Sequence, residues 1–410
     1  MWINFEQSLG QRLELKELNS SQNRAKNLRS KGAAIVRGVA GSGKSLILRN
    51  RAEKLLEDFE QILVLTYNRF MNGWLKSQLE ASQFNKVECK TFHQWAYKHL
   101  KYSYDDDISK LVKLAHKSTK RYQAILIDEA QDFPDEWFQA LLEVLDSRTK
   151  ALFIVYDNTQ SVYGQPHRRK SDWSWKSLGI NIPGGRSQVF DLNYRNSPEI
   201  LELAWKFITP ALEIADIKVE KRQRDEAGKV IYTPSIGSII EPKKKLSRSS
   251  GIQPLLLEVY YEDMPDKIAY QIQQALQTHP ESSIGILLHP QAQDLKQEIS
   301  KELTTLNIEH HAPETSRDRD GNVVSQPYVI VDSWNALKGV EFDAVIIAGV
   351  DSLSEYKPEN AEISFETKAG LYTAMTRAKD HLVMLYETKD VIVAEIEAAL
   401  NSADCLDSET

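Results

Sequence analysis

The sequence predicts an α/β fold with two domains, each built on a mostly parallel β-sheet. The chain has 410 residues, of which 41% are hydrophobic, and this is enough for more than one core. Short β-branched runs recur along it, and each is followed by a stretch with helical periodicity. The pattern occurs twice, on either side of a joint near residues 197–215.

The expected strands follow in order along the chain. In the first half they cover residues 34–37, 62–66, 124–128 and 152–156, and in the second half 255–260, 284–288, 328–331, 344–347 and 381–385. Near-continuous apolar strands with helices between them are typical of parallel sheets covered on both faces. We therefore predict a first domain over residues 1–205, a second over 206–400 and a polar tail over 401–410.

An irregular basic insertion is expected between the two patterns, over residues 218–251. It contains the runs 221–224 and 243–248, which are rich in lysine and arginine. Such a stretch is either a solvated surface loop or a contact for a nucleic-acid backbone.

Composition restricts the classes of protein that fit. Lys and Arg number 51 and Asp and Glu 58, so the net charge is −7, which excludes a polycation that holds nucleic acid by bulk charge but allows a confined basic groove. The two cysteines, Cys89 and Cys405, cannot build a disulfide framework or a cysteine zinc site, as fits a reducing compartment. No apolar run reaches the ~18 residues of a membrane span, and no signal pattern begins the chain. We expect a cytoplasmic protein that does not associate with a membrane.

A phosphate-binding loop is predicted at residues 38–45, Gly-Val-Ala-Gly-Ser-Gly-Lys-Ser. It follows an expected strand and opens a helical run over residues 46–56, which is the context that this motif requires. Its glycines let the backbone wrap a phosphate chain, Lys44 would reach the β- and γ-phosphates, and Ser45 would hold Mg²⁺. The alternative is a glycine-rich turn before a helix, but a chance match to this motif in a chain of this length is on the order of a per cent.

An acidic pair, Asp128 and Glu129, follows the apolar run at residues 124–127. Acids that end such a strand lie at the carboxyl edge of a parallel sheet, where α/β sites form. Asp128 could hold the Mg²⁺ shell, and Glu129 is the candidate general base that activates water. On its own the pair could equally be a helix cap, but together with the phosphate loop it favours hydrolysis of a nucleoside triphosphate.

Further segments follow in a fixed order: 18–22, 66–68, 91–93, 156–163, 193–195, 333–342 and 372–378. Together with the phosphate loop and the acidic pair they resemble the motifs of superfamily 1 helicases of the UvrD/Rep type, over nearly all of residues 15–390. The resemblance implies two RecA-like P-loop domains with an ATP cleft between them. The family carries accessory insertions in two intervals, which here run from His93 to Asp128 and from His311 to Lys338. Because these intervals span only 35 and 27 positions, the resemblance implies a compact form.

The resemblance assigns roles around ATP and Mg²⁺. Gln22 would contact the adenine edge, Tyr194 would stack on the base, and Glu341 would meet the ribose. The implied catalytic residues are Lys44, Asp128, Glu129, Gln160, Arg195 and Arg377; those that bind ATP are Gln22, Gly41, Ser42, Gly43, Lys44, Ser45, Tyr194, Gly339 and Glu341; and those that bind the metal are Ser45 and Asp128. Arg195 at the joint and Arg377 in the second domain could complete the γ-phosphate site only when the cleft closes.

The implied contacts with nucleic acid are Thr66, Asn68, Thr91, His93, Tyr163 and Asn335, to which the composition of the stretch at residues 167–176 adds Trp173. The sequence departs from the family here: Tyr156 replaces a glycine, Gln165 a base-stacking aromatic residue, and Asn335 a common histidine. A basic and aromatic stretch at residues 167–176 follows, and its tryptophans, Trp173 and Trp175, either stack on bases or pack a loop against the first domain.

The expected function is that of an ATP-dependent helicase or translocase on single-stranded DNA, with 3′-to-5′ polarity implied by the family. RNA is not excluded as the strand, and a nuclease or other protein partner is left open. The alternative is an ATP-gated nucleic-acid-binding switch or partner subunit with little unwinding of its own. A third reading, a small-molecule P-loop kinase, would leave the second domain and Arg377 unused.

Overall fold

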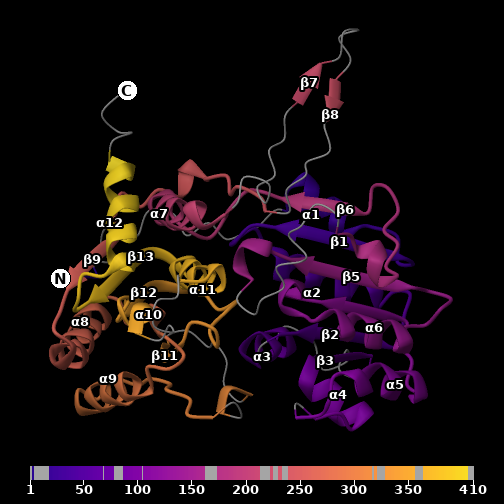
Figure 1. Ribbon diagram of the computed structural model, residues 1–410, viewed down its shortest axis with the longest axis horizontal. Coiled ribbons are helices and arrows are strands. Elements are labelled where there is room, and N and C mark those ends of the chain that lie inside the picture. Colours follow the sequence, from indigo (N-terminus) through magenta and orange to yellow (C-terminus); the bar gives the residue numbers. More distant parts are fainter. Residues whose placement is uncertain are drawn as a thin grey trace.

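The computed structural model describes residues 2–3, 18–67, 69–77, 86–103, 105–161, 173–212, 222–224, 230–232, 239–315, 318–320, 328–355 and 363–404. Two α/β lobes lie side by side, one containing the first half of the chain and one the second (Figure 1). Among these residues, no helix is long and apolar enough to cross a membrane.

The first lobe is built on a six-stranded sheet in the order β3-β2-β4-β5-β1-β6, with every pair parallel. Its strands are β1 (Ala33–Gly38), β2 (Ile62–Thr66), β3 (Val87–Thr91), β4 (Ala124–Ile127), β5 (Ala151–Tyr156) and β6 (Ser187–Phe190). Helices cover both faces: α1 (Ser20–Lys26), α2 (Lys44–Leu55), α3 (Arg69–Ser77), α4 (Phe92–Leu100), α5 (Ser109–Lys117) and α6 (Asp135–Val144). Alternate residues of one strand therefore enter different cores, as Val36 packs with α2 while Ile35 packs with α4 and α6.

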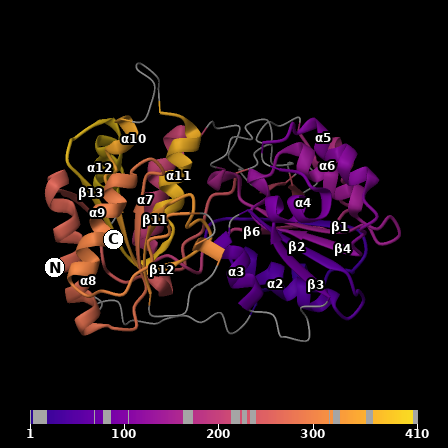
Figure 2. The same cartoon turned by 90° about the horizontal axis from the view of Figure 1, so that it is seen from below.

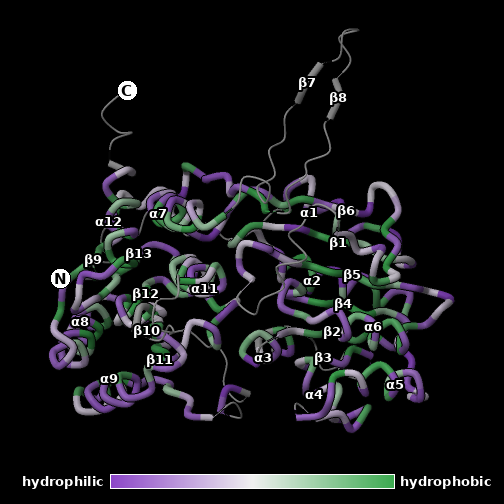
Figure 3. Tube along the Cα trace, viewed as in Figure 1, coloured by the Kyte–Doolittle hydropathy of each residue, from purple (hydrophilic) through white to green (hydrophobic). Residues whose placement is uncertain are grey.

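The second lobe is built on a five-stranded parallel sheet in the order β11-β10-β12-β13-β9. Its strands are β9 (Leu255–Glu258), β10 (Ile284–Leu288), β11 (Val329–Ser333), β12 (Phe342–Ala348) and β13 (Ala378–Tyr386). The helices α8 (Met264–Thr278) and α9 (Gln293–Thr305) cover one face, and α11 (Phe365–Met375) and α12 (Val391–Asp404) cover the other, with the short α10 (Ser352–Glu355) beside them. Apolar residues gather along the strands of both sheets (Figure 3).

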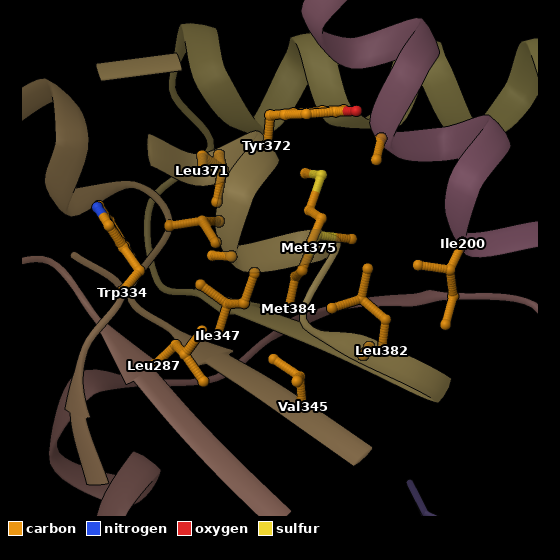
Figure 4. Close-up of a cluster of buried hydrophobic side chains, with 14 of the residues drawn as sticks. Ile200, Leu287, Trp334, Val345, Ile347, Leu371, Tyr372, Met375, Leu382 and Met384 are labelled. Atoms are coloured by element: carbon orange, nitrogen blue, oxygen red, sulfur yellow. The ribbon is translucent and has the colours of Figure 1, made fainter. Parts of the chain in front are cut away.

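Helix α7 (Pro198–Ile208) follows the first sheet in the chain but packs on the second. Its apolar side chains lie with α11 and α12 in one core, and Figure 4 shows Ile200 beside Leu382 of β13. The division of the chain at residues 205 and 206 stays a prediction; in packing terms α7 lies on the second side of it.

The α/β fold class with two parallel sheets is confirmed, and all nine expected strands are present. Two edge strands, β3 and β6, were not predicted, because in β3 only alternate residues such as Val87 and Cys89 are buried. Within residues 218–251 the structure describes an antiparallel pair, β7 (Arg222–Arg224) and β8 (Val230–Tyr232), which projects away from the lobes (Figure 1). Residues 401–404, expected in the polar tail, continue α12.

The lobes also touch through side chains of α3, which lies at their boundary in both ribbon views (Figures 1 and 2). Phe70 of α3 is buried in the core of the second lobe, beside Leu337 and Val340. Its neighbour Met71 lies against Gly339, where an added Cβ would come 2.5 Å from the Met71 Cγ atom. Gly339 also has a φ of +88°, so a side chain at this position is excluded on two grounds.

Candidate active site

The carboxyl ends of five strands bring the predicted residues of the first lobe to one edge of its sheet. β1 ends at Gly38, β2 at Thr66, β3 at Thr91, β4 at Ile127 and β5 at Tyr156. Because all these strands are parallel, the phosphate loop, the acidic pair and residues 157–160 meet at this edge.

The phosphate loop connects β1 to the N-terminus of α2, as its sequence predicts. Gly41 and Gly43 have φ angles of +63° and +84°, which a residue with a side chain adopts only at a cost. The Lys44 ammonium donates hydrogen bonds to the carbonyl oxygens of Gly38 and Val39, each at 2.9 Å, and lies 3.6 Å from the Asp157 carboxylate. A buried cation is thus held at the end of a helix whose free N–H groups favour anions.

The acidic pair lies directly beside this loop. The Ser45 hydroxyl donates to the Asp128 carboxylate at 2.8 Å, so the two predicted metal ligands are in contact. Glu129 has a left-handed φ of +52° and accepts a hydrogen bond from the Gln131 amide at 2.5 Å. Burial, and after it the Glu129 carboxylate, raise the pKa of Asp128. Burial would also raise the pKa of Glu129, but the ammonium groups of Lys338 and Lys44 outweigh it and lower that pKa.

Lys338 is a residue of the second lobe that the sequence did not single out for the site. Its ammonium group is buried, lies 2.5 Å from the Asp132 carboxylate and 3.6 Å from that of Glu129, and donates to the Gln160 carbonyl oxygen at 2.6 Å. The lysine therefore joins the acidic segment, residue 160 and the loop before β12. Its place in the predicted motif at residues 333–342 was the available signal, but the partner 206 positions away could not be inferred from spacing.

The two predicted arginines approach the cleft from the joint and from the second lobe. Arg377 is 2% exposed, and its guanidinium donates to the Thr373 carbonyl oxygen at 2.9 Å and to the Gln160 side-chain oxygen at 3.4 Å. Burial, and after it the Arg195 guanidinium, lower the pKa of Arg377 to about 9. Arg195 instead forms an ion pair with Glu341 at 2.7 Å. Glu341, the predicted ribose contact, therefore binds an arginine in this structure.

Of the two predicted base-binding residues, Tyr194 lines the same cleft, whereas Gln22 lies against the phosphate loop. The Tyr194 hydroxyl accepts a hydrogen bond from the Asn19 amide at 2.6 Å, and the Lys245 ammonium lies 5.0 Å from the centre of the tyrosine ring. Gln22 is fully buried, with its amide oxygen accepting from the Asn19 backbone N–H and its amide nitrogen donating to the Ser42 carbonyl oxygen at 3.0 Å. Its amide is therefore engaged with the start of α1 and with the phosphate loop.

Residues of both lobes line one cleft with a volume of about 600 Å³, although Gln22, Asp128 and Lys338 are not part of its lining. The first lobe and the joint contribute residues 40–46, Glu129, Gln160, Tyr194 and Arg195 to its walls, and the second lobe contributes Gly339, Glu341, Arg377, Lys379 and Asp380. The size suits a nucleotide-sized ligand, and cations from both lobes face acids and phosphate-binding backbone from the first.

Comparison with known proteins gives two family matches, one on each side of this cleft. Residues 22–166 match the family described as AAA domain, and residues 328–385 match the UvrD-like helicase C-terminal domain. A stretch of 125 residues is 30% identical to the RecBCD enzyme subunit RecB of Chlamydia trachomatis serovar D. Together these matches support a superfamily 1 helicase of the UvrD/Rep type.

The similarity to RecB covers 27% of this chain and 12% of that protein, so the chain spans a small part of the relative's length. Among solved structures, the C-terminal domain of a possible DNA helicase from Lactobacillus plantarum WCFS1 is similar with a TM-score of 0.31 and 15% identity, over 50% of this chain and 96% of that one. Arterivirus nonstructural protein 10, a helicase solved with DNA, is similar with a TM-score of 0.38 and 10% identity, over 92% of this chain and 65% of that one.

The residues expected to touch nucleic acid come from both lobes: Thr66, Thr91 and His93 lie at or just after the carboxyl ends of strands in the first sheet, and Asn335 follows β11 of the second. Thr66 and Thr91 end β2 and β3, and both are buried, with the Thr91 hydroxyl capping α4. His93 packs edge-on against the Trp137 ring at 4.8 Å, and Asn335 is half-buried in the loop after β11. Two of the predicted contacts, Asn68 and Tyr163, lie outside the described residues, as does Gln165.

The two tryptophans of the basic and aromatic stretch have different environments. Trp175 is buried and packs edge-on against Phe138 and Tyr156 in the core of the first lobe. Trp173 is half-buried and packs against Trp175, with ring centres 5.0 Å apart. The structural interpretation therefore fits Trp175, and Trp173 remains the candidate for stacking.

Proposed function

We propose that the chain is an ATP-driven translocase or helicase that acts on single-stranded DNA and moves from 3′ to 5′. The observation that carries the proposal is the convergence of Lys44, Glu129 and Gln160 from the first lobe with Arg377 from the second in one cleft. A site shared between two lobes changes when the lobes move, and this is how nucleotide turnover can drive movement along a strand.

The residues of the phosphate loop fit a bound triphosphate. Lys44 and the backbone N–H groups of residues 41–45 would bind the β- and γ-phosphates. Ser45 and Asp128 fit Mg²⁺, because their hydroxyl and carboxylate oxygens are in contact and are the hard ligands that this ion prefers. When bound, the ion neutralises charge that develops on the phosphates.

Glu129 would accept the proton of the attacking water, and Gln131 and Lys338 hold its carboxylate in place. Gln160 would orient the γ-phosphate and already contacts Arg377. Arg377 and Arg195 would stabilise the charge of the transition state, as guanidinium groups do when they reach phosphate oxygens from a second domain. Arg195 can do this only if its ion pair with Glu341 breaks when ATP binds, so that its guanidinium group contacts the phosphate instead.

The test of this proposal is the ATP hydrolysis rate with single-stranded DNA, single-stranded RNA, duplex DNA or no nucleic acid. We expect single-stranded DNA to stimulate turnover most. In Lys44→Ala tight nucleotide binding and hydrolysis should be lost, because the phosphates lose their cation. The matched control is Lys54→Ala, which should behave as wild type. Lys54 lies on the exposed side of α2, and its ammonium group pairs with Glu57. A Lys44→Ala protein with normal turnover would remove this loop from the site.

Trp173 and Trp175 provide a separate prediction for strand binding. If Trp173 stacks on a base, Trp173→Ala should weaken single-stranded DNA binding by about 1–3 kcal/mol with ATP affinity unchanged. Trp175→Ala should instead lower the free energy of unfolding by about 3–5 kcal/mol, because it removes a buried ring. Fluorescence anisotropy and urea unfolding measure the two effects, and unchanged DNA affinity in Trp173→Ala would make its role structural too.

The second candidate function is an ATP-gated nucleic-acid-binding switch. It is favoured by the short interval between His93 and Asp128, where the described residues form α4, α5 and the core strand β4, and α5 packs on α6 of the same lobe. Little surface is then available to hold a duplex at a junction. We therefore expect strand displacement on a long duplex with a 3′ overhang to be weak in the isolated chain; unwinding of hundreds of base pairs would contradict this expectation.

A further inference from the structure

Two buried asparagines lie at the joint between the lobes, on either side of Tyr194 and Arg195. Asn193 is 0% exposed and Asn196 is 1% exposed. Neither belongs to a helix or strand of the two lobes, and the roles assigned above do not use them. Buried amides are costly unless their donors and acceptors are satisfied, and the hydrogen bonds of both asparagines meet this requirement across the joint.

Asn193 joins the phosphate loop to Asn196. Its amide nitrogen donates to the Ala40 carbonyl oxygen at 2.9 Å and to the Asn196 side-chain oxygen at 2.6 Å. Its own side-chain oxygen accepts from the backbone N–H groups of Arg195 and Asn196, both at 2.9 Å. Both donors and both acceptor positions of this amide are therefore used.

Asn196 continues the connection into the second lobe. Its amide nitrogen donates to the Thr376 carbonyl oxygen at 3.1 Å and to the Ala378 carbonyl oxygen at 2.5 Å. These two carbonyls flank Arg377. An unbroken series of side-chain hydrogen bonds thus runs from the phosphate loop, through Asn193 and Asn196, to the backbone on both sides of the arginine.

The geometry leaves little freedom in this connection. An added Cβ at Gly41 would lie 2.7 Å from the Arg195 Cβ and 2.9 Å from the Asn193 amide nitrogen, so the loop and the joint are in close contact. The Tyr194 backbone N–H also donates to the Gly41 carbonyl oxygen at 2.9 Å. A shift of the phosphate loop must therefore be accompanied by a shift of residues 193–196 or by loss of these bonds.

We propose that Asn193 and Asn196 are positioning residues that couple the phosphate loop to Arg377, so that a bound triphosphate and the arginine are held in register. The inference rests on the proposed function, because it requires that Arg377 acts on the γ-phosphate. Neither asparagine touches the nucleotide; each binds backbone carbonyls next to residues that do, Ala40 in the phosphate loop and Thr376 and Ala378 on either side of Arg377. Their amides suit this task because an amide both donates and accepts in one plane, which lets two of them transmit a fixed geometry.

The experiment is steady-state ATP hydrolysis by the full chain carrying Asn196→Ala, with rates counted per active site titrated with a fluorescent ADP. We expect kcat to fall by about 10–100-fold, since a misplacement of about 1 Å can cost about 10² in rate. The KM for ATP and the ADP affinity should change less than about threefold. Asn401→Ala, at an exposed position of α12, is the matched control.

Two further variants separate coupling from a general structural role. If the pair acts as one unit, the double variant Asn193→Ala/Asn196→Ala should have a kcat no lower than that of the slower single variant. If the two defects were independent, their fold-losses in kcat would multiply. In Asn196→Ser the hydroxyl can donate to one of the two carbonyls, so its kcat should lie between those of wild type and Asn196→Ala. If Asn196→Ala does not fold, Asn196→Ser replaces it in the comparison with wild type.

The outcomes distinguish this inference from the proposed function. A wild-type chain without ATP hydrolysis would overturn the proposed function and this inference together. An active wild type with a slow Arg377→Ala variant and a normal kcat in the asparagine variants would overturn the coupling alone. Losses in the single variants that multiply in the double variant would also overturn it.

Discussion

Replacing Glu129 by glutamine is expected to leave nucleotide binding near normal and to lower the rate of ATP hydrolysis by about 10²–10⁴-fold, the share that a positioned general base supplies. The substitution keeps the size of the side chain, and the glutamine oxygen can still face Lys338. An amide cannot accept the proton of water, so the chemical step is the one that fails.

The environment of Glu129 also predicts how this activity depends on pH. The Lys338 and Lys44 ammonium groups lower the pKa of Glu129 against the effect of burial, so its carboxylate stays charged as the pH falls well below neutrality. Protonation of Glu129 should therefore not limit turnover between pH 6 and pH 8. Glu281→Gln, at an exposed position before β10, is the matched control. A Glu129→Gln variant with the wild-type rate would mean that another group is the base.

The second large effect is expected from Arg377. Arg377→Ala should slow turnover by about 10³-fold or more while ATP still binds, because the guanidinium acts mainly on the charge of the transition state. Arg377→Lys should recover little of this activity, since an ammonium group cannot reproduce the planar donor pair that contacts Gln160 and Thr376. Single-turnover hydrolysis together with nucleotide titration separates the two steps.

Arg148→Ala is the control for this series, because Arg148 is exposed and pairs only locally with Asp146. Arg377 is buried, so urea unfolding must show that Arg377→Ala is folded under the assay conditions. Normal hydrolysis in a folded Arg377→Ala protein would contradict a site shared between the lobes.

Much of the fold and of the first lobe's share of the cleft could be predicted from sequence. Parallel strands end at one edge, so residues that follow β1, β4 and β5 had to meet, and Lys44, Glu129 and Gln160 do so in the cleft. The edge strands β3 and β6 were missed because they carry few buried apolar residues and lack the near-continuous pattern of the central strands.

The contacts between the lobes could not be predicted, since they depend on how two separate cores dock. Lys338 reaching Asp132, Phe70 entering the second core, and α7 packing beyond the expected boundary all join segments more than a hundred positions apart. Glu341 shows the same limit: the motif implies a ribose contact, but the docked lobes place Arg195 on its carboxylate. Asn193 begins the motif at residues 193–195, but the role of the asparagine pair could not be inferred, because a buried amide has no periodicity or charge that marks it.

The central claim, that this cleft drives movement along single-stranded DNA, is tested most directly by displacement of streptavidin from biotinylated oligonucleotides by the full chain. With ATP, we predict displacement from a 5′-terminal biotin that is much faster than from a 3′-terminal biotin, and none from either end with Arg377→Ala. Stimulation of ATP hydrolysis by single-stranded DNA without displacement from either end would contradict the motor and favour the switch.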